Sequence, residues 1–137
     1  MNIAQALAQA HGLGLDRLEA QALMLHALGR DRHDRAWLLL HDTDAVPPNV
    51  LSMFNHFIQR RLRHEPLAYL TGSQDFHGLT LLVDPRVLVP RSDTETLVDW
   101  ALSLKLEQAQ VLDLGTGSGA IALALQHAQP HWHVTAV

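Results

Sequence analysis

The residues best suited to do chemistry lie in a nine-residue stretch, Val111-Leu112-Asp113-Leu114-Gly115-Thr116-Gly117-Ser118-Gly119. A short apolar strand that ends in Gly-x-Gly-x-Gly lets the backbone turn sharply into a helix, and glycines let a ligand approach the main chain closely. Gly115, Gly117 and Ala120 also satisfy the Gly-x-Gly-x-x-Gly/Ala pattern of dinucleotide-binding proteins. The glycine spacing alone therefore leaves the cofactor open.

Asp113 is more informative, because it lies two residues before the first glycine, near the carboxyl end of the strand where ligands of open α/β sheets bind. A carboxylate there would repel a pyrophosphate but attract the sulfonium and ammonium groups of S-adenosylmethionine. The expected cofactor-binding residues are Asp113, Gly115, Thr116, Gly117, Ser118 and Gly119. The alternative is that Asp113 only caps the next helix or pairs with a surface base, and that the glycines serve only a tight turn.

The sequence around the loop predicts the elements that must position it. Val111–Leu114 is a short apolar strand, and Ala120–Ala128 is a nearly all-apolar helix ended by Pro130. Alternating apolar residues from Trp132 to Ala136 open a second strand. Two parallel strands alone are marginally stable and need further neighbours, so we expect the chain to be the N-terminal part of a longer protein.

Upstream of the loop, Gln74–Val83 is predicted to be a β-hairpin, because short segments rich in β-formers flank Gly78. Pro85 and Pro90 fix an extended link. Ser92-Asp93-Thr94-Glu95 then carries the Ser-x-x-Glu spacing of a capping box, which predicts a helix from about Asp93 to Leu106.

The first 63 residues show helical periodicity throughout. A helix that begins at Ile3 is expected to end at Gly12 and Gly14. Gly29 is placed to cap the end of a second helix. Pro47 and Pro48 can start the longest helix, since proline in the first turn loses no needed hydrogen bond. The later helices are predicted over Leu15–Leu28, Ala36–Leu40 and Pro47–Arg63.

Composition restricts the kinds of partner. Apolar residues make up 47% and charged residues 18%, as in globular proteins, and the formal net charge of -4 argues against direct binding of nucleic acid. No cysteine is present, so disulfides and thiolate metal sites are excluded. We expect no membrane-spanning segment and no secretory signal, and hence a cytoplasmic protein. The oligomeric state is unknown.

Two further groups of charged or titratable residues stand out in the sequence. The histidines at 127, 131 and 133 cluster within seven residues, and His131 and His133 share one strand face. No carboxylate or third histidine lies at ligand spacing nearby, so no metal site is expected. The arginines at 60, 61 and 63 end the longest helix, where they complement the negative end of its dipole. The alternative is that they contact an acidic or RNA-bound partner.

Two more strings complete a pattern: Glu65-Pro66-Leu67-Ala68-Tyr69-Leu70-Thr71-Gly72 and Leu88-Val89-Pro90-Arg91-Ser92-Asp93-Thr94-Glu95. Together with the glycine loop, the chain resembles the protein-glutamine N5-methyltransferases that modify peptide chain release factors. The resemblance spans the whole chain. It implies transfer of a methyl group from S-adenosylmethionine to the glutamine amide of the Gly-Gly-Gln motif, with the helical part helping to dock the release factor.

The resemblance also implies an α + α/β fold in three parts. Residues 1–72 would form a small helical bundle for substrate docking, residues 73–84 a hairpin linker, and residues 85–137 the start of a Rossmann-like methyltransferase domain. Arg91 and Thr94 match family positions near the cofactor, but a plain helix start explains them equally well. The Asn-Pro-Pro-Tyr motif that holds the substrate amide in this family is absent from residues 1–137, so no catalytic residue is assigned and the chain alone is expected to be inactive.

Two other classes of function stay open at this point. One is a different S-adenosylmethionine-dependent methyltransferase, or a nicotinamide-dependent oxidoreductase with a glycine-rich loop, although Asp113 speaks against the oxidoreductase. The other is a non-catalytic module that holds a partner through its helices.

Overall fold

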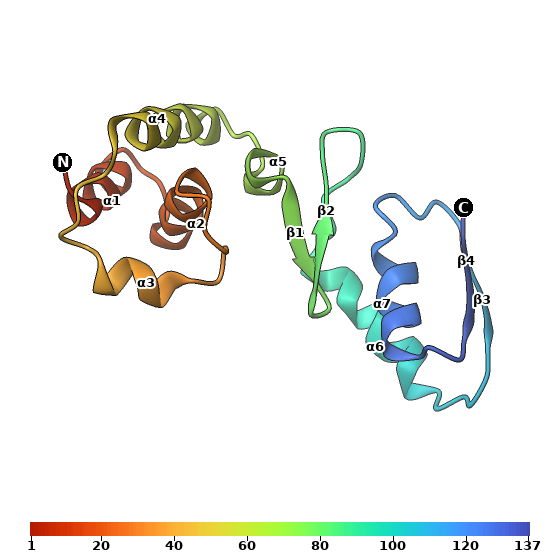
Figure 1. Cartoon of the computed structure of the whole chain (residues 1–137). Coiled ribbons are helices and arrows are strands. Elements are labelled where there is room, and N and C mark those ends of the chain that lie inside the picture. Colours follow the sequence, from red (N-terminus) through yellow and green to blue (C-terminus); the bar gives the residue numbers. More distant parts are fainter. The chain divides into compact units, whose positions relative to one another are not determined.

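The computed structural model describes all residues from 1 to 137 and divides into two compact units, Met1–Thr71 and Gly72–Val137. Figure 1 shows that the first unit is built from helices and the second from helices and strands. This confirms the predicted fold class, a helical N-terminal part followed by α/β structure. No helix combines the length and apolar character needed to cross a bilayer.

The first unit is a bundle of five helices. The helices predicted from periodicity are all present, and their ends lie within two residues of the predicted ends. The bounds are α1 Ile3–Gly12, α2 Arg17–Ala27, α3 Arg35–Leu40, α4 Pro48–Leu62 and α5 Leu67–Thr71. The short α5 was not predicted. The carbonyl of Pro66 accepts hydrogen bonds from the N–H groups of Tyr69 and Leu70, so Pro66 starts this helix.

The helix ends follow local rules that the sequence contains. Asn2 forms a capping box with Gln5, in which each side chain accepts the other's backbone N–H at 2.8 and 3.0 Å. Gly29 adopts a left-handed φ of 67° after α2, and the N–H groups of Gly29 and Arg30 donate to the carbonyls of His26 and Leu25. This is the Schellman pattern, and it confirms the predicted cap at Gly29.

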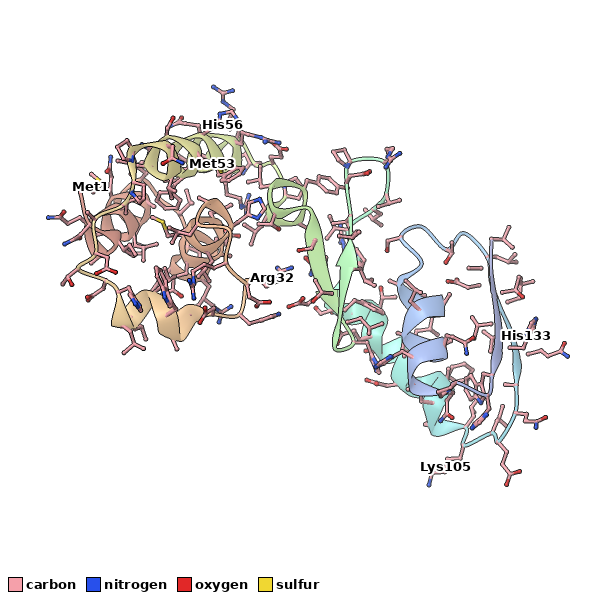
Figure 2. The ribbon with its side chains drawn as sticks, viewed as in Figure 1. Met1, Arg32, Met53, His56, Lys105 and His133 are labelled. Atoms are coloured by element: carbon pink, nitrogen blue, oxygen red, sulfur yellow. The ribbon has the colours of Figure 1, made fainter.

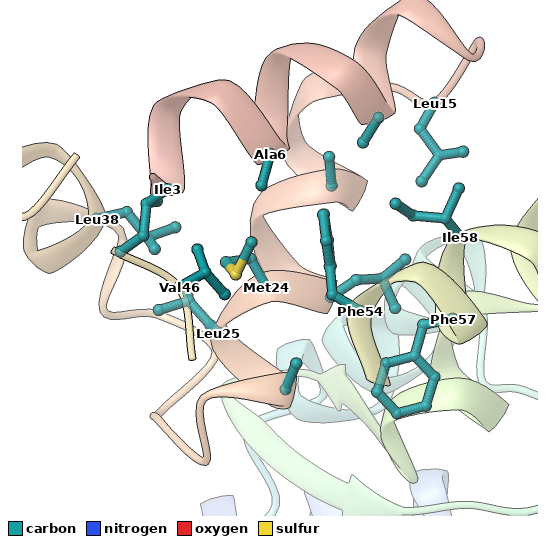
Figure 3. Packing of buried hydrophobic residues seen from close by; sticks show 14 of the residues in the cluster. Ile3, Ala6, Leu15, Met24, Leu25, Leu38, Val46, Phe54, Phe57 and Ile58 are labelled. Atoms are coloured by element: carbon teal, nitrogen blue, oxygen red, sulfur yellow. The ribbon is translucent and has the colours of Figure 1, made fainter. Parts of the chain in front are cut away.

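The core of the bundle is apolar and contains side chains from all five helices and from the loops before α2 and α4 (Figure 3). Phe54 of α4 is fully buried beside Leu23, Met24 and Leu25 of α2. Each such side chain contributes roughly 1.5–3 kcal/mol by leaving water, so the apolar stripes seen in the sequence are what hold the bundle together.

The second unit contains a hairpin, two helices and a parallel pair of strands. The bounds are β1 Ser73–Phe76, β2 Leu79–Leu82, the 3₁₀ turn η1 Ser92–Thr94, α6 Glu95–Ser103, β3 Gln110–Asp113, α7 Ala120–Ala128 and β4 His133–Ala136. The hairpin prediction is confirmed, with β1 and β2 antiparallel. His77 and Gly78 turn the chain with φ values of 48° and 76°, the two positive angles that a two-residue type I′ hairpin needs.

The hairpin packs with the rest of the second unit. Phe76 and Leu81 lie in one apolar cluster with Val98 of α6, Leu125 of α7 and Trp132. The hairpin therefore contributes to the core of residues 72–137, while its assignment as a separate linker in a three-part division, 1–72, 73–84 and 85–137, stays a prediction.

The predicted capping box at the start of α6 is wrong. Neither Ser92 nor Thr94 makes a side-chain capping bond there. The Glu95 carboxylate instead accepts the backbone N–H of His77 at 2.9 Å, and the His77 ring bonds to Asp99 at 2.8 Å. The carboxylate therefore accepts a hydrogen bond from the hairpin turn instead of capping the helix, and Glu95 links the hairpin to α6.

The strands β3 and β4 are parallel, with Asp113 opposite Ala136, and α7 makes the crossover between them. Val111 and Val134 face the core that α7 helps to form. On the other face Leu112 is 59% exposed, and His133 extends away from α7 (Figure 2). Only one face of this two-stranded sheet is covered by a helix.

Candidate functional site

The glycine loop between β3 and α7 has the backbone shape that its sequence predicts. Gly115, Gly117 and Gly119 have φ values of 70°, 58° and 81°, in the left-handed region that residues with a Cβ rarely adopt. An added Cβ at Gly115 or Gly117 would meet no atom within 4 Å. Glycine is required here by conformation rather than by crowding, and the space above both positions is open to a ligand.

Val137, which directly follows β4, holds this loop in place. The N–H groups of Gly115 and Thr116 both donate to the carbonyl of Val137, at 2.8 and 3.0 Å, and the Val137 N–H donates to the carbonyl of Asp113 at 2.9 Å. Val137 was not among the expected cofactor-binding residues. No side-chain signal could have found it, since only its main chain takes part.

Asp113 stands at the carboxyl end of β3 and is half-buried. The Thr116 hydroxyl donates to its Oδ2 atom at 2.8 Å, so loop and strand are joined by side chains as well as by the main chain. Asp113 does not cap α7, whose N-cap is Gly119, and its only side-chain hydrogen bond is the one to Thr116. The Oδ1 atom remains available as an acceptor.

Free backbone donors follow the loop at the start of α7. The first N–H groups of α7, at Ala120, Ile121 and Ala122, have no carbonyl acceptor, as is normal at a helix start. These donors suit the polar and anionic parts of a ligand, while Asp113 suits a cationic part. The loop therefore offers both kinds of contact within a few residues.

Ser118 connects the loop to a second segment, which was not among the expected site residues. It lines an open hollow of about 500 Å³ together with the residues that follow the hairpin, including Val83 and Val87. At the edge, Arg86 forms a bidentate ion pair with Asp84, 2.6 Å from Nη2 to Oδ2. This pair lowers the pKa of Asp84 to about 2, so both charges are matched within the chain.

The remaining candidates lie apart from this arrangement. Arg91 is exposed, and neither its side chain nor that of Thr94 bonds to the glycine loop. No three of the histidine, aspartate and glutamate side chains are grouped so that they could hold a metal ion.

Two of the three helix-ending arginines form ion pairs within the bundle. Arg61 binds Glu19 of α2 through two hydrogen bonds of 3.0 and 3.1 Å. Arg60 binds Glu65 in the same bidentate manner, with 2.7 Å between Nε and Oε2, and this bond lowers the pKa of Glu65. Arg63 alone stays exposed and unpaired, so the group does not form a basic surface.

A strand, a glycine loop and a crossover helix leading to a parallel strand form a βαβ unit of the kind from which doubly wound domains are built. Here that unit follows a helical bundle. Residues 1–72 match the family model described as the PrmC N-terminal domain. The chain belongs to this family.

Curated relatives extend the similarity into the α/β unit. The chain is 50% identical over 125 residues to the release factor glutamine methyltransferase of Bordetella pertussis, and 42% identical over 125 residues to that of Xylella fastidiosa. These alignments cover 90% and 89% of this chain, but 45% and 44% of the relatives. A third relative with the same name, from Mycolicibacterium smegmatis, is 39% identical over 98% of this chain and 46% of its own length. The chain thus spans less than half the length of the relatives it matches.

Proposed function

We propose that this chain forms the helical domain and the first cofactor-binding unit of a release factor glutamine methyltransferase. The proposed reaction moves a methyl group from S-adenosylmethionine to the side-chain amide of the glutamine in the Gly-Gly-Gln motif of peptide chain release factors. The single observation that carries the proposal is the glycine loop with Asp113 at its base, in a chain whose relatives bear that name.

The loop fits S-adenosylmethionine on chemical grounds. The Asp113 carboxylate keeps Oδ1 free for a cationic group, and the absence of Cβ atoms at Gly115 and Gly117 leaves room for a ligand against the main chain. Thr116 would orient the carboxylate, and Ser118 would line the same side of the site as the segment after the hairpin. The bound cofactor supplies an activated methyl group on its sulfonium sulfur.

The chemistry on the substrate demands precise orientation. An amide nitrogen is a poor nucleophile because its lone pair is delocalised, so the enzyme must hold it in line with the methyl group and accept its hydrogens. Residues 1–137 contain no Asn-Pro-Pro-Tyr string for this task. The role we assign to this chain is to bind the cofactor with its second unit and the release factor with its first. A cytoplasmic location follows, since release factors act there.

The test is a methylation assay with the product of the gene that encodes this chain. The purified protein would be incubated with a bacterial release factor and S-adenosylmethionine carrying a labelled methyl group, and the modified peptide would be mapped by mass spectrometry. We expect one methyl group on the glutamine of Gly-Gly-Gln. A release factor with alanine at that glutamine is the matched control and should stay unlabelled. Label on another residue, or no label on either substrate, would refute the proposal.

A further inference from the structure

Two carboxylates on one side of α6 hold the turn of the hairpin, which lies beside this helix in Figure 1. The Glu95 carboxylate accepts the main-chain N–H of His77 at 2.9 Å, and the Asp99 carboxylate accepts the Nε2–H of the His77 ring at 2.8 Å. Glu95 and Asp99 are four residues apart, so they are neighbours on the helix surface. We call these two residues the α6 clamp. The clamp bonds one turn residue through both its main chain and its side chain.

The α6 clamp fixes a direction that apolar packing leaves free. Phe76 and Leu81 of the hairpin are buried in the same apolar cluster as Val98 of α6, and this packing keeps the hairpin against the helix. Burial of apolar surface is non-directional, whereas a hydrogen bond weakens steeply when its angle changes. The packing therefore keeps the hairpin on α6, and the clamp determines the direction in which the hairpin points.

The end of the hairpin opposite the turn forms one wall of the hollow beside the glycine loop. The Val83 N–H donates across the hairpin at 3.0 Å, so the strand pairing continues past β2. The Asp84 side chain then accepts the N–H of Arg86 at 2.9 Å and closes a tight turn. The hairpin thus leads without a break into residues 83–87. A change in the direction of the hairpin moves this wall relative to Ser118, which lines the same hollow.

The opposite wall is attached to the same helix. Ser118 lies just before α7, and α7 packs against α6. Ala120 and Ala124 of α7 belong to one buried cluster with Val98 of α6. Both walls of the hollow are therefore connected through α6, the first by the clamp together with apolar packing and the second by apolar packing alone.

We propose that Glu95 and Asp99 are positioning residues for the cofactor site, which raise the affinity for S-adenosylmethionine by keeping residues 83–87 opposite Ser118. Neither carboxylate bonds to the glycine loop, and both act through His77. The inference rests on the proposed function, because it takes the hollow beside Ser118 as part of the cofactor site. Without the clamp the wall occupies its place for a smaller fraction of the time, and the apparent Kd rises as that fraction falls.

The experiment is calorimetric titration of S-adenosylmethionine into the product of the gene that encodes this chain. Glu95→Ala should raise Kd about fivefold, the factor that corresponds to one net hydrogen bond. Glu95→Gln keeps an oxygen that can accept the His77 N–H, so its Kd should stay close to that of the unaltered protein. Asp99→Ala keeps the main-chain bond and should raise Kd only about twofold, because the Asp99 side chain is 70% exposed. This milder variant also decides the matter if Glu95→Ala does not fold.

Trp132→Phe is the control for a general loss of stability. It removes the indole hydrogen bond to the carbonyl of Leu106 and leaves the α6 clamp intact. It should lower the free energy of unfolding about as much as Glu95→Ala and leave Kd unchanged. An unchanged Kd in Glu95→Ala and Asp99→Ala, or an equal rise in Trp132→Phe, would overturn the inference and leave the proposed function standing. No binding by the unaltered protein would overturn both.

Discussion

Replacing Asp113 by asparagine tests the electrostatic basis of the proposed cofactor site. Asparagine keeps an oxygen that can accept the Thr116 hydroxyl, so the loop should stay in place while the negative charge is removed. For a cofactor cation about 5 Å from the carboxylate, Coulomb's law gives about 3 kcal/mol at an effective dielectric constant of 20 and about 1 kcal/mol in bulk water. Because Asp113 is half-buried, the effect should lie between these limits. That corresponds to roughly a 10- to 100-fold increase in Kd.

The assay is isothermal titration calorimetry of S-adenosylmethionine with the product of the gene that encodes this chain. Glu107→Gln makes the same change in net charge at an exposed residue outside the loop and should leave Kd within twofold, about the size of an exposed, screened charge effect. Raising the salt concentration should reduce, but not remove, the difference in Kd between Asp113→Asn and the unaltered protein, because a half-buried charge is screened less than an exposed one. An unchanged Kd for Asp113→Asn would refute the choice of a cationic cofactor.

Three further predictions concern the supports of the two units. Glu95→Ala should destabilise the second unit by about 1–2 kcal/mol, because the His77 N–H loses its charged acceptor. Ser92→Ala should leave stability unchanged, because Ser92 makes no capping bond. Urea unfolding measures the free energy of unfolding of both variants. Phe54→Ala should cost the bundle about 3–5 kcal/mol by opening a cavity in its core, measured by circular dichroism during urea unfolding. The Arg60 bond lowers the pKa of Glu65, so its stabilisation is complete above the ordinary glutamate value of about 4.3 and is lost as the pH falls through the lower value of the folded protein.

Each of these predictions has an outcome that would contradict it. If Ser92→Ala lowered the free energy of unfolding more than Glu95→Ala, Ser92 would cap the helix after all. Met53 is 46% exposed next to Phe54, so Met53→Ala should change stability by no more than about 0.5 kcal/mol, and a comparable loss from both would show that the core is misplaced. For the pH effect, Arg60→Gln should make the free energy of unfolding depend less on pH below about 4.3. An identical pH dependence in Arg60→Gln and the unaltered protein would mean that the ion pair does not stabilise the fold.

The tertiary structure changed the assignment of two residues whose local pattern was clear. Glu95 has the spacing of a capping residue, yet its carboxylate bonds to the hairpin turn, a partner 18 residues away in sequence. Trp132 was predicted to begin the second strand, but it is 3% exposed, its indole N–H donates to the carbonyl of Leu106, and the strand starts at His133. Long-range contacts decided both cases, and local spacing contains no information about such contacts.

Part of the candidate site could likewise be predicted from the sequence, and part depends on the tertiary structure. The sequence by itself determined that residues 115–119 turn the chain, because three glycines were required at positions with positive φ, and it determined which helices carry apolar stripes. Only the tertiary structure decided that the Val137 carbonyl holds the loop, that Thr116 orients Asp113, and that Ser118 faces the segment after the hairpin. Torsion preferences and periodicity are properties of neighbouring residues, whereas a binding site depends on which distant segments the packed core brings together.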